Sequence, residues 1–96
     1  MTYLLTYGER AERHIEAVPR ELIDSLEYHL FALARTPVKV SVPVASPPFP
    51  RRGQLYHFYA VGSGGATIFF TVIFQYSQDE TALHILSVTW REWIEE

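Results

Sequence analysis

The apolar pattern of this chain changes at Thr36–Pro37, and that change restricts the fold more than any other feature of the sequence. Between Glu9 and Arg35 apolar residues recur every three or four positions, as on one face of a helix. Beyond Pro37 they recur at every second position, as in strands. A residue before proline is disfavoured in a helix, so helical structure should end there. Helices followed by hairpin-linked strands indicate an α+β fold on an antiparallel sheet.

Two helices are expected in the first half. Glu9–Val18 places its apolar residues at helical spacing, and Arg20–Arg35 carries a longer apolar stripe with acids early and an arginine last. Pro19 suits the first turn of the second helix, where a missing N–H leaves no helical bond unmade. Because almost no chain separates the two segments, they should form a two-helix hairpin that packs on the sheet.

Strands are expected before and after the helices. Thr2–Tyr7 alternates weakly and should be a first strand, although the sequence does not say which later strand it joins. The strand at Ala66–Tyr76 is apolar on both faces and should be central. The remaining strands should span Gln54–Val61 and Ala82–Trp90, with turns at Gly62–Gly65 and Ser77–Thr81.

The segment Val38–Pro50 alternates like a strand but contains four prolines. Proline is tolerated only at the edge of a sheet or outside it. We therefore expect an irregular or edge segment within a single domain that spans residues 1–96, since ninety-six residues suffice for one core.

Composition excludes several classes of protein. An apolar content of 48% is too high for a disordered chain, and the absence of cysteine excludes disulfides and thiolate metal sites. The four histidines lack metal-ligand spacing, so neither a metal nor a cofactor is expected. The chain opens without a basic segment followed by an apolar run, and its least charged stretch alternates like strands. We expect a cytoplasmic protein with no membrane partner.

Charge is distributed unevenly. The net charge is −3, yet no Asp or Glu occurs from Tyr28 to Gln78, where Arg35, Lys39, Arg51 and Arg52 lie. A locally basic sheet could contact phosphates despite the negative total. The alternative is that these four bases are ordinary solvated side chains.

Four stretches in order resemble the RelE/ParE toxin superfamily over nearly the whole chain. They are Tyr3–Tyr7 ahead of the Pro19-linked helices, Arg51–Phe58 with its Arg-Gly entry into a hairpin, Thr67–Val72, and Leu86–Glu92. Each stretch alone is a common pattern, and the resemblance depends on their joint order.

The resemblance implies a type II toxin whose partners are a cognate antitoxin, the ribosome and mRNA. Members of the family that cut mRNA let the 2′-hydroxyl attack its own phosphate. A base takes the hydroxyl proton, cations stabilise the pentavalent charge, and an acid protonates the leaving oxygen, with no metal required.

The family positions assign roles to residues of this chain. Arg91 matches the arginine that follows the last strand and acts on the scissile phosphate. His57 falls where related enzymes carry a strand lysine, and imidazole is suited to act as a general base. The expected substrate contacts are Arg51, Arg52, Tyr59 and Trp93, the last two by stacking.

Two departures from the family favour a non-catalytic alternative. Thr67 replaces a strand arginine, and the sequence ends at Glu96 without the C-terminal tyrosine of many members. Losing one aligned donor lowers a rate by roughly two to three orders of magnitude. The chain could therefore be a ParE-like gyrase inhibitor or an inactive RelE-fold protein. A third possibility is an assembly module that pairs through the Val38–Val44 edge.

Structural roles compete with the functional ones. His57 would be a core histidine if its face of the strand packs against the helices, and His84 is expected to be structural. Arg91 could simply form an ion pair with its neighbour Glu92. Trp90 and Trp93 are three residues apart and would close the core from a terminal helical turn.

Overall fold

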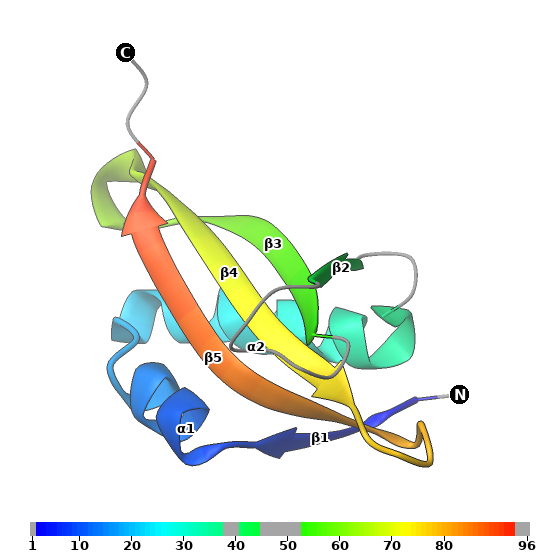
Figure 1. Cartoon of the computed structure of the whole chain (residues 1–96). Helices are drawn as coiled ribbons and strands as arrows, with labels where there is room; N and C mark the ends of the chain where they lie inside the picture. Colours follow the sequence, from blue (N-terminus) through cyan, green and yellow to red (C-terminus); the bar gives the residue numbers. More distant parts are fainter. Residues whose placement is uncertain (1, 38–40, 45–52, 94–96) are drawn as a thin grey trace.

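The computed structural model describes residues 2–37, 41–44 and 53–93, and in it two helices pack on one face of a five-stranded sheet (Figure 1). This arrangement confirms the α+β fold class. The elements in chain order are β1 (Leu4–Tyr7), α1 (Glu9–Glu16), α2 (Arg20–Arg35), β2 (Ser41–Val44), β3 (Gly53–Val61), a 3-10 turn (Ser63–Gly65), β4 (Thr67–Tyr76) and β5 (Ala82–Glu92).

The strands lie in the order β1-β5-β4-β3-β2, so β4 is the central strand, as its two apolar faces predict. Every neighbouring pair is antiparallel except β1 and β5, which run parallel from the pair Leu4 and Ala82. The sheet is therefore mixed at one edge, because the first and last strands of the chain meet there.

The helices supply one wall of the core. α2 spans the predicted Arg20–Arg35 and packs on β3, whereas α1 ends two residues before the expected Val18 and packs on β5. The β3–β4–β5 side chains that face the helices form the opposite wall. The buried residues are Ala11, Val18, Leu22, Leu26, Leu30 and Leu33 from the helical half and Tyr56, Phe58, Ala60, Phe70, Val72, Phe74, Leu83, Ile85 and Val88 from the strands.

Strand β5 contains a β-bulge. Ile73 of β4 pairs with Ser87, but the next residue, Phe74, pairs with Ile85, so Leu86 is an extra residue in β5. The Val88 backbone N–H beyond the bulge donates to Nδ1 of His14 on α1, at 3.1 Å. Because side chains alternate along a strand, the extra residue reverses the alternation for the rest of β5. Odd-numbered residues such as Leu83 and Ile85 face the helices before the bulge, and the even-numbered Val88 faces them after it.

The edge segment is described only in part. Ser41–Val44 pairs with β3 at the end of the sheet and includes Pro43, as an edge strand can. Residues 38–40 and 45–52, which include the remainder of the expected edge segment, lie outside the described residues. The glycine turn between β3 and β4 is confirmed, with Gly64 and Gly65 at φ of 76° and 82°.

His29 joins α2 to the sheet and should make stability depend on pH. Its ring stacks on Phe58 at 4.0 Å, Nδ1 lies 2.8 Å from the Tyr56 hydroxyl, and burial lowers the pKa of the imidazole. The folded state then binds a proton less readily than the unfolded state. We expect the free energy of unfolding to be fully retained above about pH 6.5, the ordinary pKa of an imidazole, and to decrease as the pH falls below it.

Urea unfolding at a series of pH values checks this expectation. A His29→Gln variant should lose the part of the slope below about pH 6.5 that this imidazole causes. An unchanged slope in that interval would show that another group is responsible.

Candidate functional site

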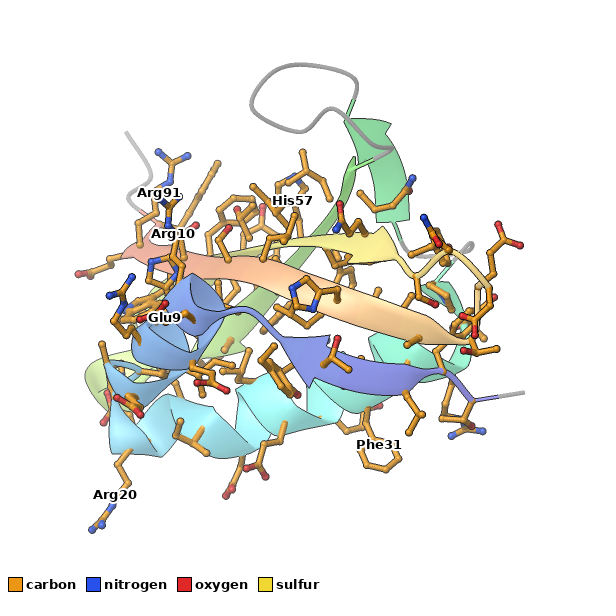
Figure 2. All side chains as sticks on the ribbon, turned by 60° about the horizontal axis from the view of Figure 1, so that its bottom comes forward. Glu9, Arg10, Arg20, Phe31, His57 and Arg91 are labelled. Carbon is orange, nitrogen blue, oxygen red and sulfur yellow. The ribbon has the colours of Figure 1, made fainter. Side chains whose placement is uncertain are left out.

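The face of the sheet opposite the helices carries the candidate site. No described element covers this open face, and along β3 the alternation places His57 and Tyr59 on it while Tyr56 and Phe58 face the helices. Figure 2 shows His57 and Arg91 on the same side of the sheet, with Arg20 and Phe31 on the other side. His57 is therefore exposed and is not a core histidine.

Two rows of paired residues run across β3, β4 and β5 on the open face. Tyr59, Phe69 and Arg91 form the first row, because Phe69 pairs with each of the other two. His57, Thr71 and Thr89 form the second row, because Thr71 pairs with both His57 and Thr89. This row lies next to the first. Three strands are thus needed to bring the predicted residues His57, Tyr59 and Arg91 together.

Phe69 lies at the centre of this group. Its ring stacks on His57 at 5.0 Å with 20° between the planes, and Tyr59 lies at 5.1 Å. The Cζ atom of Arg91 lies 5.8 Å from the centroid of the same ring, within the range of a cation–π contact. Phe69 therefore contacts an imidazole, a phenol and a guanidinium with one aromatic ring.

Trp93 extends the aromatic surface. Its ring lies 6.1 Å from Tyr59 and 6.2 Å from Phe69, and it remains 44% exposed. The expected terminal helical turn is wrong, because β5 continues to Glu92 and the Trp93 N–H donates to the Thr67 carbonyl at 2.7 Å.

The two tryptophans consequently lie on opposite faces. Residues three apart in an extended strand point in opposite directions, unlike residues three apart in a helix. Trp90 packs against the core beside Phe70, at 6.1 Å, so its expected role in the core is confirmed, whereas Trp93 belongs to the open face.

His57 has one ring nitrogen committed within the protein. Nδ1 lies 3.2 Å from the Thr71 hydroxyl, which fixes the ring over Phe69. Nε2 would accept a proton if Nδ1–H donates to Thr71, and would donate one if the hydroxyl donates to Nδ1. In either tautomer the orientation of the ring is set by Thr71 and Phe69.

Arg91 borders a shallow depression beside Phe69. The depression has a volume of about 310 Å³ and is lined by Phe69, Thr71, Thr89, Trp90 and Arg91. Arg91 is exposed, and among the described residues no ion pair joins it to Glu92, because the only pair found there is Arg13 with Glu9. The guanidinium therefore remains available for a ligand.

Positive charge on the open face is sparse within the described part of the chain. Arg91 is the one Lys or Arg on that face there, since the other described arginines lie on α1 and α2. Thr67, the position at which the resemblance had implied an arginine, lies on the face of β4 that carries Phe69. The predicted contacts Arg51 and Arg52 lie outside the described residues.

Phe69, Thr71 and Thr89 belong to the same group on the open face, although the sequence pattern alone did not single them out. The signal was the alternation of β4, which separates Phe69 and Thr71 from the buried Phe70 and Val72. Apolar residues on both faces of a strand predict a central position, but they do not indicate what the second face contacts.

The other histidines lie outside this group. His84 is bonded through Nδ1 to the Thr6 hydroxyl at 2.8 Å, which fits the structural role expected of it. Across residues 2–37, 41–44 and 53–93 no group of three or more His, Cys, Asp or Glu side chains is placed to hold a metal. No helix in the same ranges is long and apolar enough to cross a membrane.

Comparison with known proteins gives structural relatives only. No protein-family model and no curated protein matches the sequence. The RelBE2 toxin–antitoxin complex of Mycobacterium tuberculosis contains a chain that matches with a TM-score of 0.69 and 17% identity, over 95% of this chain and all of that one.

Two further solved structures have the same fold as this chain. A mutant of the Escherichia coli toxin RelE in the free state matches with a TM-score of 0.61 and 17% identity, over 92% of this chain and 82% of that one. The RelE–RelB complex of Pyrococcus horikoshii gives 0.53 and 15%, over 93% and 94%. The expected resemblance is confirmed at the level of structure, and the chain has the fold of the RelE toxins.

Proposed function

We propose that this chain is the toxin of a type II toxin–antitoxin system and that it cuts mRNA on the ribosome without a metal. The observation that carries the proposal is the group of His57, Tyr59, Phe69, Arg91 and Trp93 on the open face of a sheet with the RelE fold. Such a group offers a proton acceptor, a phosphate ligand and stacking surfaces at one place.

The chemistry would be transesterification within the RNA. His57 would take the proton of a 2′-hydroxyl, whose oxygen attacks the adjacent phosphorus while Arg91 stabilises the added negative charge. The bond to the 5′-oxygen breaks, and that oxygen receives a proton, leaving a 2′,3′-cyclic phosphate and a 5′-hydroxyl. Tyr59, Phe69 and Trp93 would hold the unstacked bases beside the phosphate, with Arg51 and Arg52 as further contacts.

The toxin would have a cognate antitoxin in the cytoplasm, where its proposed substrate is. The structures of M. tuberculosis and P. horikoshii that share the fold are toxin–antitoxin complexes. An antitoxin that covers the open face, or that packs on the helices and distorts it, would keep this chain inactive.

A cell-free bacterial translation reaction tests the proposal. Purified protein is added, and the 5′ ends of the mRNA are mapped by primer extension. New ends that keep a constant phase with the codons and that require ribosomes would support it. Intact mRNA at protein concentrations equal to those of ribosomes would overturn the nuclease assignment.

The His57→Gln variant should distinguish a role of His57 in proton transfer from a role in binding to the ribosome. Glutamine keeps a polar side chain of similar reach but cannot act as a base, so cleavage should fall by roughly 10²–10⁴-fold while binding to ribosomes is retained. Single-turnover cleavage and ribosome co-sedimentation measure the two effects.

The matched control is His84→Gln, which removes an imidazole from β5 that is bonded to Thr6. Its cleavage rate should equal that of the unmodified protein. Full activity of the His57→Gln variant would exclude this imidazole as the base.

A second function, inhibition without catalysis, is favoured by one observation. Arg91 is the one cation on the described part of the open face, with Thr67 where the family has an arginine. A ParE-like protein that binds DNA gyrase, or an inactive RelE-fold protein, needs no phosphate cluster. This candidate predicts intact mRNA in the translation reaction, and the gyrase variant predicts inhibition of DNA supercoiling in vitro.

A further inference from the structure

The outer surface of α2 carries exposed aromatic residues far from the candidate site. Tyr28 is 71% exposed and Phe31 is 68% exposed, more than any other described aromatic side chain. Figure 2 shows Phe31 on the opposite side of the molecule from His57. Exposed apolar patches of a few hundred Å² are often functional, so this aromatic pair is a candidate interaction surface.

Charged residues stand at both ends of this aromatic pair. Asp24, Tyr28, Phe31 and Arg35 follow one another at steps of four, three and four residues, which is the spacing of a coiled-coil seam. At about 100° per residue all four lie within roughly 30° of one line along the helix. The residues form a stripe with an acid at one end, two rings in the middle and a base at the other end.

The stripe is complementary to itself. When two such helices run antiparallel about a two-fold axis between residues 29 and 30, each residue faces the one whose number completes a sum of 59. Asp24 then faces Arg35 of the other copy, and Tyr28 faces its Phe31. No described ion pair occupies Asp24 or Arg35 within one chain, so both charges remain available.

A hollow on the same surface is lined by residues that form the same symmetric pairs. It has a volume of about 380 Å³ and lies between the rings and the charged ends of the stripe, where the second copy's ring could enter. Glu27 and Ala32 complete its lining, and their numbers also sum to 59. Its lining residues are Asp24, Glu27, Tyr28, Phe31, Ala32 and Arg35.

We propose that this protein forms a symmetric dimer in which α2 packs antiparallel against α2 of a second copy. Equivalent surfaces then meet equivalent surfaces, so the assembly closes at two chains and does not grow into a filament. The open face of each sheet points away from the contact, because α2 lies on the other side of the sheet (Figure 1).

The expected affinity is modest. Two rings that are about two-thirds exposed bury roughly 250–300 Å² per copy, and with their neighbours the contact reaches about 1,000 Å² in total. This size lies at the low end of specific interfaces, so a dissociation constant in roughly the micromolar range is expected.

Sedimentation velocity over a concentration series tests the dimer. From about 1 μM to about 500 μM the unmodified protein should pass from one chain to two, as a micromolar dissociation constant requires. The Tyr28→Ser and Phe31→Ser double variant should remain monomeric, and its circular dichroism should be unchanged because both side chains are exposed. A protein that stays monomeric throughout, or a double variant that still dimerises, would overturn the proposal.

Exchanging the charges identifies the arrangement of the helices. Asp24→Arg places two arginines opposite each other at both ends of the contact and should weaken the dimer by roughly tenfold. Adding Arg35→Asp restores opposite charges and should restore the dimer, which only an antiparallel pairing of these two positions explains. Arg10→Asp on α1 is the control and should have no effect.

Cysteine pairing provides a second measurement, since the chain contains no cysteine. A mixture of one chain with Tyr28→Cys and another with Phe31→Cys should form a mixed disulfide much faster than a mixture of Tyr28→Cys with Glu9→Cys. Equal rates in the two mixtures would exclude the antiparallel α2 contact. A complex with one copy of each chain in which the antitoxin covers this stripe would also exclude it.

Discussion

Phe70→Ala is expected to reduce the free energy of unfolding by about 3–5 kcal/mol, which is a large part of the stability of a domain this small. The Phe70 side chain is fully buried in the central strand and stacks on Phe58 with ring centroids 4.7 Å apart. Its removal leaves a cavity between sheet and helices that the stiff β4 backbone cannot close. Urea unfolding monitored by circular dichroism measures the loss.

The matched control is its neighbour on the same strand. Phe69→Ala removes an equal number of atoms from the open face, where the ring remains partly exposed, and should cost less than about 1.5 kcal/mol. In the cleavage assay the order should be the reverse, with the larger loss of activity in Phe69→Ala. Phe69 contacts His57 and Arg91, whereas Phe70 contacts the core. Equal losses of stability would contradict the assignment of the two faces of β4.

Arg91→Ala should lower the rate of mRNA cleavage by roughly 10²–10³-fold, the usual effect of removing one charge-stabilising donor from an active site. The side chain is exposed and rests on Phe69, so the melting temperature should remain nearly unchanged. Single-turnover cleavage in the translation reaction gives the rate, and growth arrest on expression gives the effect in cells.

Two variants show whether the effect belongs to this position. Arg91→Lys keeps the charge but loses the planar fork that contacts a phosphate through two N–H groups, so it should recover only part of the rate. Arg20→Ala removes an exposed arginine from the opposite side of the sheet and should retain full activity (Figure 2). A variant without Arg91 that still arrests growth fully would support the non-catalytic alternative.

The fold was largely predictable because its signals are local. Helical spacing predicted the bounds of α2, and the glycine run predicted the turn between β3 and β4. The partner of β1 was not predictable in this way, since its contact with β5 joins residues more than seventy positions apart. Pairing over such a separation leaves no trace in a short window of sequence.

The candidate site was predictable only in part. His57 and Arg91 were predicted from their positions in a family pattern, and the structure brings them onto one face of the sheet, but their roles stay a prediction. Phe69 was missed because a buried and an exposed phenylalanine look alike until the neighbouring strands assign the faces of β4. Trp93 was assigned to a helical turn because only six residues followed the predicted strand.

The bulge at Leu86 determines which chemistry the end of β5 presents. Ile85 and Val88 both face the helices, although they are three positions apart, because the extra residue shifts the phase of the strand. If β5 kept all of its residues but paired regularly with β4, Arg91 would share the inward face of Leu83 and Ile85, and a guanidinium would be directed into an apolar core. His14 on α1 holds the backbone just beyond this insertion. The position of the bulge, and not the number of residues alone, therefore decides where the guanidinium points: moving the bulge beyond Arg91 would turn this side chain toward the helices, whereas deleting Leu86 would close the bulge and leave Arg91 on the open face.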